Sequence, residues 1–250
     1  MTGRLEGKNA FVTGAAGGIG REICRRFVEE GARVVAADLE TSAIQDVLGD
    51  LDASSFRAVA CDIGDEQQVA SAIEGAVTAF GGLDVLCNTA GGSSQADGRI
   101  TEVGVEEFWR VMRVDLFGTF LVSRFGIPHL ITAGGGSVIN LTSVTALRGF
   151  PQRTAYSAAK GGIAAMTRAM AAGYGEERIR VNAIAPGSTM SPRVAARAHT
   201  EQAKKTAAKH VLGVLDPIDI AEMAVFLASD ESRRITGQVH VVDSGFTTVL

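Results

Sequence analysis

The chain has 250 residues, of which 46% are hydrophobic and 21% are charged, and this balance excludes an intrinsically disordered chain. Its 30 glycines follow no three-residue period, which excludes collagen, and a net charge of −4 without a basic face argues against a nucleic-acid partner. No apolar run is as long as a membrane span, and the polar start fits no signal peptide, so we expect a cytoplasmic protein without a membrane partner.

Short apolar runs alternate along the chain with segments whose apolar residues recur at helical spacing. Strands are predicted at 9–13, 33–37, 56–61, 83–87, 136–141, 180–185 and 239–242. The helices between them include 105–131, 154–173 and one that Asp216 and Pro217 begin. Strict alternation predicts a doubly wound α/β fold, with a seven-stranded parallel sheet covered on both faces in a single domain over residues 1–250. Ligands of such sheets bind outside the carboxyl ends of the strands.

A glycine cluster at residues 13–20 joins the first predicted strand to the first helix. Gly14 permits a tight turn, Gly18 lets the backbone approach a pyrophosphate, and Gly20 allows the helix to pack closely on the strand. The helix N-terminus offers unpaired N–H groups and the positive end of its dipole. Because the cluster lies between a strand and a helix, it predicts Rossmann-like dinucleotide binding rather than a plain turn.

Asp38 ends the second predicted strand, 18 residues after Gly20. A carboxylate there can accept hydrogen bonds from the ribose hydroxyls of NAD, and it would repel the 2′-phosphate of NADP. The neighbouring residues Gly17 and Leu39 supply no cation for that phosphate. The sequence therefore favours NAD as the cofactor.

Two further strand ends bear on the cofactor. Asp62 could accept from the adenine amino group while Ile63 covers the ring, although an aspartate here could equally cap the next helix. Residues 88–91, at the end of the fourth strand, form a glycine-containing segment that is expected to line the cofactor site.

Tyr156 and Lys160 are four residues apart on a predicted helix, so they lie on one face about one turn apart. A cation near a phenol favours the phenolate and lowers the phenol pKa from about 10, which makes a general acid/base usable near neutral pH. Ser143 ends the fifth strand, 13 residues before the tyrosine. A serine hydroxyl and a tyrosine acid together can polarise and protonate a ketone as a hydride arrives.

In this order and at these spacings, the motifs resemble the short-chain dehydrogenase/reductase family over nearly the whole chain. The matching residues are Thr13, Gly14, Gly18, Gly20, Asn88, Ala90, Gly91, Ser143, Tyr156, Lys160, Asn182, Pro186, Gly187, Gly237, Gln238 and Asp243. The resemblance implies that Tyr156 is the acid/base, that Lys160 binds the nicotinamide ribose and that Ser143 holds the substrate oxygen. Residues 188–191 would contact the nicotinamide carboxamide, with Ser191 where the family often has threonine.

Residue-based reasoning and the resemblance together give one set of expected cofactor contacts. These are Gly14, Gly18, Ile19, Gly20, Asp38, Asp62, Ile63, Asn88, Ala90, Gly91, Tyr156, Lys160, Pro186, Gly187, Thr189 and Ser191.

The chain departs from the family pattern in three places: Thr89 replaces an asparagine, Ser244 a glycine, and Asp115 the catalytic asparagine. That asparagine holds a relay water largely through its backbone carbonyl, so Asp115 is counted with the catalytic residues. An ionised Asp115 near Lys160 would weaken the pull of the cation on the phenol. We favour the arrangement in which the Asp115 side chain points away from the site and only its backbone carbonyl takes part in the proton relay.

We therefore predict an NAD(P)-dependent alcohol dehydrogenase or ketone reductase, with NAD preferred, that transfers a hydride between NAD(H) and a small secondary alcohol or ketone. The chain also resembles 3-oxoacyl-thioester (carrier protein) reductases, but Asp38 leans away from these NADPH-linked enzymes. A non-catalytic dinucleotide-binding protein, or another doubly wound enzyme such as a methyltransferase, needs none of Ser143, Tyr156 and Lys160.

Residues 188–213 contain few large apolar side chains, and loops of this length are often lids, so we expect them to close over the nicotinamide. The small residues of 154–173 would let another helix approach closely; with the resemblance, they predict a homotetramer, or else a homodimer. Trp109, Phe117 and Phe120 are expected in the core or a subunit contact.

The four histidines and three cysteines lack ligand spacing, so we expect no metal site, and we expect the cysteines to be buried thiols.

Overall fold

Within residues 3–196 and 198–249, which this computed structural model describes, seven parallel strands form one sheet in the order β3-β2-β1-β4-β5-β6-β7. The strands are β1 (Asn9–Thr13), β2 (Arg33–Asp38), β3 (Phe56–Ala60), β4 (Val85–Asn88), β5 (Gly136–Leu141), β6 (Ile179–Pro186) and β7 (Val239–Val242). The order reverses direction between β1 and β4, which is the point where doubly wound sheets bind ligands. The predicted fold class is confirmed, and strand ends differ from prediction by at most two residues.

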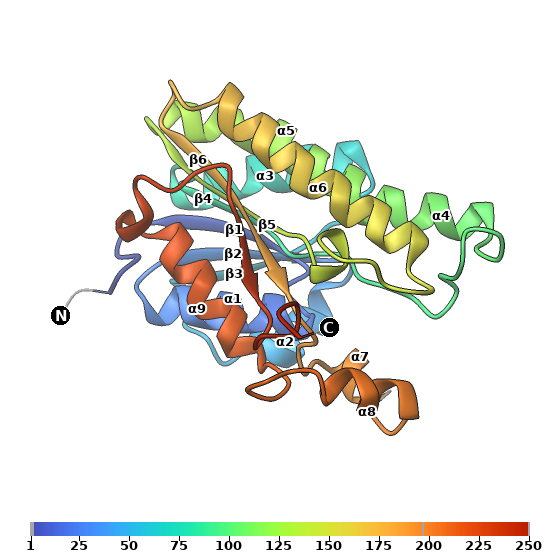
Figure 1. Ribbon diagram of the computed structural model, residues 1–250. Coiled ribbons are helices and arrows are strands. Elements are labelled where there is room, and N and C mark those ends of the chain that lie inside the picture. Colours follow the sequence, from blue (N-terminus) through green and yellow to red (C-terminus); the bar gives the residue numbers. More distant parts are fainter. Residues whose placement is uncertain (1–2, 197, 250) are drawn as a thin grey trace.

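Helices cover both faces of the sheet (Figure 1). They are α1 (Gly18–Glu29), α2 (Thr41–Leu48), α3 (Glu66–Phe80), α4 (Val105–Val111), α5 (Gly118–Thr132), α6 (Thr154–Gly173), α7 (Pro192–Ala195), α8 (Glu201–Ala207) and α9 (Pro217–Ala228). Buried residues of α1, α2 and α9 form one apolar core against the sheet, and those of α3 and α5 form a second core on its other face. Cys24, Cys61 and Cys87 are buried free thiols, as predicted.

The helix predicted at 105–131 is continuous but not uniform. A π-helical turn at Met112–Phe117 separates α4 from α5, and Asp115 lies in this turn. The hydroxyl of Thr119 donates to the Asp115 carbonyl at 2.7 Å. By length and composition Val105–Thr132 could cross a membrane, but half of its most apolar stretch is buried in the protein. In this structure the segment packs between α3 and α6 (Figure 1).

Candidate active site

Four of the predicted site residues lie at the carboxyl edge of the sheet. They are Asp115, Ser143, Tyr156 and Lys160. The Nζ of Lys160 lies 5.5 Å from the centroid of the Tyr156 ring and 2.9 Å from Asp115 Oδ1. The same Nζ donates to the carbonyl oxygen of Leu141, the last residue of β5, at 2.9 Å. Ser143 follows two residues later, and its hydroxyl accepts from the Thr145 N–H at 3.2 Å. The fold thus brings the phenol, the ammonium and the carboxylate together, and places the serine beside the strand end that holds the ammonium.

The ammonium of Lys160 is held in a nearly dry environment, with 4% of its side chain exposed. Burial by itself lowers the pKa of a lysine, but the carboxylate of Asp115 and the phenol of Tyr156 act against it. The net result is a pKa of Lys160 above its ordinary value. Lys160 therefore stays a cation across the whole neutral range.

The expectation that the Asp115 side chain points away from the site is wrong. Its carboxylate faces Lys160, and it also accepts from the Gly92 N–H at 3.1 and 3.3 Å through its two oxygens. The physical reason is Gly91, which has φ +126°: a Cβ at that position would lie 2.5 Å from Asp115 Oδ1. A residue without a side chain leaves the room that the carboxylate occupies.

Asp97 supports the acid/base helix, and sequence reasoning missed it. Its buried carboxylate accepts from the Ala155 N–H at 3.1 Å and from the Tyr156 N–H at 3.0 Å. The residue in the N-cap position of α6, Arg153, makes no side-chain capping bond, so Asp97 satisfies the first turn from a distant loop. The only signal in the sequence was this poor N-cap, which does not say where the replacement comes from.

The glycine loop fits a dinucleotide. Gly14 has φ +68°, and a Cβ there would lie 2.7 Å from the Ala90 Cα. A Cβ on Gly20 would lie 2.2 Å from the Gly14 carbonyl oxygen, so both positions demand glycine. Helix α1 begins at Gly18 with no capping side chain from the described residues, which leaves its first N–H groups for an anion.

Asp38 lies directly beside this loop. Its carboxylate accepts from the Ala16 N–H at 2.9 Å and from the Leu39 N–H at 2.8 Å. Among the described residues it has no cationic partner. A carboxylate fixed by two backbone donors at this edge suits ribose hydroxyls and disfavours a phosphate.

The adenine contacts expected of Asp62 and Ile63 stay predictions, but the alternative of a helix cap at Asp62 is wrong. Asp62 is not the cap of the next helix: Asp65 is, because its side chain accepts from the Gln68 N–H. Asp62 instead pairs with Arg113 of the π-helical turn at 2.8 Å. Ile63 is 7% exposed and packs against Gly118, where a Cβ would lie 2.5 Å from its Cδ1.

The side chain of Asn88 belongs to the scaffold beneath the site. Its Nδ2 donates to Asn140 Oδ1 at 2.8 Å, and Asn140 Nδ2 donates to the Thr167 hydroxyl at 2.9 Å. This buried chain joins β4, β5 and α6. The Thr13 hydroxyl accepts from the Ala90 N–H at 3.3 Å, which fixes the segment after β4 beside the end of β1.

The segment after β6 passes over the glycine loop at the carboxyl edge of the sheet. Thr189 is buried and pairs with Leu215 in an isolated bridge that closes the base of the predicted lid. Ser191 caps the short α7, and a Cβ on Gly18 would lie 2.9 Å from its Cβ. Residues 188–213 thus reach back to the glycine loop and carry α7 and α8, which stand apart from the sheet in Figure 1.

Two residues that sequence reasoning passed over hold this segment. Arg193 donates to the Gly91 carbonyl at 3.2 Å. His210 is buried; its Nε2 lies 3.0 Å from the Ser188 nitrogen, and its Nδ1 lies 3.0 Å from the Thr206 carbonyl oxygen. Neither belongs to a recognisable motif, because each acts on backbone groups that only the fold brings near.

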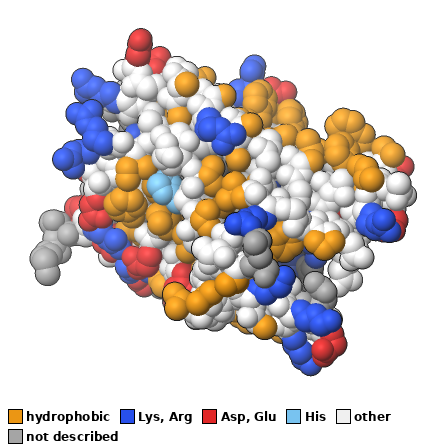
Figure 2. Space-filling view, viewed as in Figure 1, with side chains coloured by type: hydrophobic (Ala, Val, Ile, Leu, Met, Phe, Trp, Pro, Cys, Tyr) orange, Lys and Arg blue, Asp and Glu red, His pale blue; other side chains and the backbone are white. Residues whose placement is uncertain are grey.

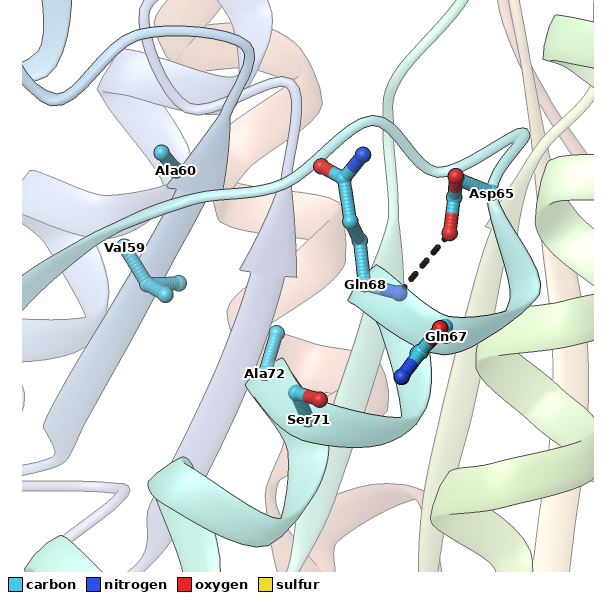
Figure 3. A pocket seen from close by; sticks show the side chains of 7 residues that line it. All are labelled: Val59, Ala60, Asp65, Gln67, Gln68, Ser71 and Ala72. Atoms are coloured by element: carbon cyan, nitrogen blue, oxygen red, sulfur yellow. Dashed lines mark hydrogen bonds between the residues drawn. The ribbon is translucent and has the colours of Figure 1, made fainter.

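A separate hollow of about 450 Å³ lies between the edge strand β3 and α3. Figure 3 shows its lining, including the bond that Asp65 accepts from Gln68. None of the predicted site residues lines it. The polar groups there belong to the start of α3, so the hollow adds nothing to the site at the switch point.

Comparisons with known proteins show which family the chain is similar to. A family model described as enoyl-(acyl carrier protein) reductase matches residues 14–247. Cis-4-hydroxycyclohexanecarboxylate dehydrogenase of Sinomonas cyclohexanicum is 37% identical and aligns over 96% of both chains. The 3-oxoacyl-(acyl-carrier-protein) reductase of Thermotoga maritima is 35% identical over 97% of this chain and 98% of its own.

One solved structure and one further relative show the same family resemblance. A structure described as a short-chain dehydrogenase/reductase from Burkholderia xenovorans superposes with a TM-score of 0.93, at 33% identity and 99% coverage of both chains. Cyclohexanol dehydrogenase of an Acinetobacter strain is a further relative, 31% identical over 99% of this chain and 98% of its own. The chain therefore belongs to the short-chain dehydrogenase/reductase family of oxidoreductases.

Proposed function

We propose that this protein oxidises a small secondary alcohol to a ketone with NAD as the hydride acceptor, and that Tyr156 is the acid/base. The observation that carries the proposal is Lys160, held between the Tyr156 ring and the end of β5, where Ser143 follows. A dinucleotide-binding protein without activity has no use for this arrangement. A methyltransferase on a doubly wound sheet has none either.

The proposed residues divide the chemistry between proton and hydride. When bound, the nicotinamide supplies an electrophilic carbon that takes a hydride. The phenolate of Tyr156 removes the hydroxyl proton of the substrate while the C–H bond of the carbinol carbon breaks toward the cofactor. Ser143 would donate to the same substrate oxygen, and the Lys160 ammonium faces the Tyr156 ring that takes the proton. The alcohol would lose a hydride from carbon and a proton from oxygen to yield the ketone, the hydride going to the nicotinamide and the proton to Tyr156.

Asp38 supports NAD rather than NADP. Its carboxylate is fixed by two backbone donors beside the glycine loop, where the adenosine ribose would lie. A phosphate there would meet an uncompensated negative charge. The expected contacts of the adenine and the carboxamide, around Asp62 and Thr189, belong to the same proposal.

A carrier-protein reductase is the second candidate, because the Thermotoga relative carries that name and aligns over nearly its full length. Two relatives are named for ring alcohols, and this makes cyclic secondary alcohols the first substrates to try. The test incubates pure protein with NAD or NADP and a panel of cyclic alcohols, hydroxysteroids and a 3-hydroxyacyl thioester, and follows the absorbance of reduced nicotinamide. NAD-dependent turnover of an alcohol supports the proposal; activity confined to NADP and the thioester supports the second candidate.

We also propose a cytoplasmic homotetramer in which residues 188–213 act as a lid. Trp109, Phe117 and Phe120 are 63%, 43% and 42% exposed, so they do not belong to the core of one chain. They line a groove of about 810 Å³ with residues of α6, and Figure 2 shows hydrophobic side chains gathered over this region. Ala158 and Ala165 on α6 are exposed beside it, which leaves space for the helices of a second copy.

A further inference from the structure

We propose that Asp115 tunes the cofactor site toward the oxidised form, so that the protein binds NAD+ more tightly relative to NADH than it would with a neutral residue there. The inference rests on the proposed function in one respect, namely that the carboxyl edge of the sheet binds a nicotinamide dinucleotide. It concerns the balance of charge around Lys160, which the substitution of an amide by a carboxylate changes.

The geometry makes Asp115 a permanent part of that balance. Its side chain is 1% exposed and lies 2.9 Å from Lys160 Nζ, while Gly92 donates to its oxygens from the other side. An amide would keep the shape and one acceptor but would leave the ammonium without a counter-charge. The negative charge of Asp115 therefore neutralises the buried positive charge of Lys160 at the carboxyl edge of the sheet, where the dinucleotide is proposed to bind.

The other charged groups around the pair do not supply that cancellation. Arg110 of α4 is already paired with Glu107 at 2.7 Å. Arg193 of α7 donates to backbone carbonyls and, among the described residues, has no carboxylate partner. Tyr156 contributes a phenol. With Asp115 neutral, the region would carry the charges of both Lys160 and Arg193, and no other carboxylate of the described residues forms an ion pair with either of them.

The two redox forms of the cofactor respond differently to this field. The nicotinamide ring of NAD+ carries a positive charge that the ring of NADH lacks, while the adenosine and diphosphate are the same in both. A buried charge is little screened by salt, so removing a carboxylate near Lys160 penalises NAD+ and leaves NADH nearly unchanged. Only the ratio of the two dissociation constants is expected to move, because contacts common to both forms cancel in it.

Equilibrium binding of NAD+ and NADH to the full-length protein, by calorimetry without substrate, tests the inference. In Asp115→Asn the ratio Kd(NAD+)/Kd(NADH) is expected to rise about threefold to tenfold over wild type. The matched control is Asp84→Asn at the opposite edge of the sheet, where the carboxylate accepts from the Asn9 N–H at 2.8 Å; its ratio is expected to match wild type.

A second variant serves if Asp115→Asn does not fold. Lys160→Gln removes the cation and leaves the carboxylate, so at alkaline pH its ratio is expected to fall below that of wild type. An unchanged ratio in a folded Asp115→Asn, or in Lys160→Gln, overturns the inference while the proposed function stands. Wild-type protein that binds neither nucleotide overturns both.

Discussion

The carboxylate of Asp115 lies 2.9 Å from the ammonium of Lys160, and both side chains are buried. The ammonium also faces the Tyr156 ring, so one cation is shared between a carboxylate and a phenol. The Lys160 ammonium is expected to activate Tyr156, and the negative charge of Asp115 partly cancels the field of that ammonium at the phenol. This pair governs the pH dependence that we expect.

Replacing Asp115 by asparagine is expected to shift the pH–rate profile for alcohol oxidation toward acid. The carboxylate helps to hold the pKa of Lys160 above its ordinary value, and it also offsets the field of the ammonium at the phenol. Without it, the full positive charge favours the phenolate, which is the form that accepts the substrate proton. The apparent pKa of kcat/KM should therefore be lower in the variant than in the wild type. Superimposable profiles would mean that the charge of Asp115 does not reach the tyrosine.

Asp38 is expected to set cofactor choice, with kcat/KM higher for NAD than for NADP in the wild type. Asp38→Asn keeps one acceptor for the backbone donors Ala16 and Leu39 and removes the charge. The preference should narrow by about tenfold or more, because a carboxylate facing a phosphate dianion is strongly unfavourable where screening is weak. Glu40→Gln, on the exposed start of α2, is the control. A wild type that uses NADP equally well would contradict the assignment.

Asp97 is expected to matter for both stability and rate. Asp97→Ala leaves the N–H groups of Ala155 and Tyr156 without their acceptor, which should lower the free energy of unfolding by about 1–2 kcal/mol, as for loss of a helix cap. The Tyr156 backbone loses an anchor, so kcat should fall while NAD binding persists. Denaturant unfolding and single-turnover rates test the two effects. Asp97→Asn, which retains an acceptor, should restore most of the stability; equal stability of Asp97→Ala and wild type would rule out the capping role.

The apolar groove on α4, α5 and α6 is expected to join copies of the chain. Trp109→Glu together with Phe120→Glu places charges on side chains that are exposed in one copy, so the fold should persist while assembly weakens. Light scattering at micromolar concentration should show a tetramer for wild type and smaller particles for the double variant. A wild type that runs as a clean 26.0 kDa particle would contradict the proposal.

The sequence predicted the parts of the site that depend on local spacing. Tyr156 and Lys160 share a helix face, and the glycines of residues 14–20 sit at one turn, so chain order alone places them. The π-helical turn at Met112–Phe117 left no periodic signal, because the apolar pattern runs through it. The direction of the Asp115 side chain depends on that turn and on the bare backbone of Gly91, and neither could be seen in the spacing.

Contacts between distant segments were also beyond the sequence. Asp97 caps α6, which begins more than 50 residues later in the chain. Asp62 pairs with Arg113 and does not cap α3, the next helix in the chain. Such contacts are set by how loops meet at the edge of the sheet. The motifs thus indicated which residues gather at the site, and the fold determined which of them touch.

The most direct test of the account is turnover by Tyr156→Phe. With NAD and an alcohol that the wild type oxidises, kcat should fall by about 10²–10⁴-fold, because the variant lacks the group that takes the substrate proton. Calorimetry should still detect NAD binding and circular dichroism should show the wild-type fold, which separates lost chemistry from lost binding. A Tyr156→Phe variant that retains most of the wild-type kcat would contradict the central claim that this phenol is the acid/base.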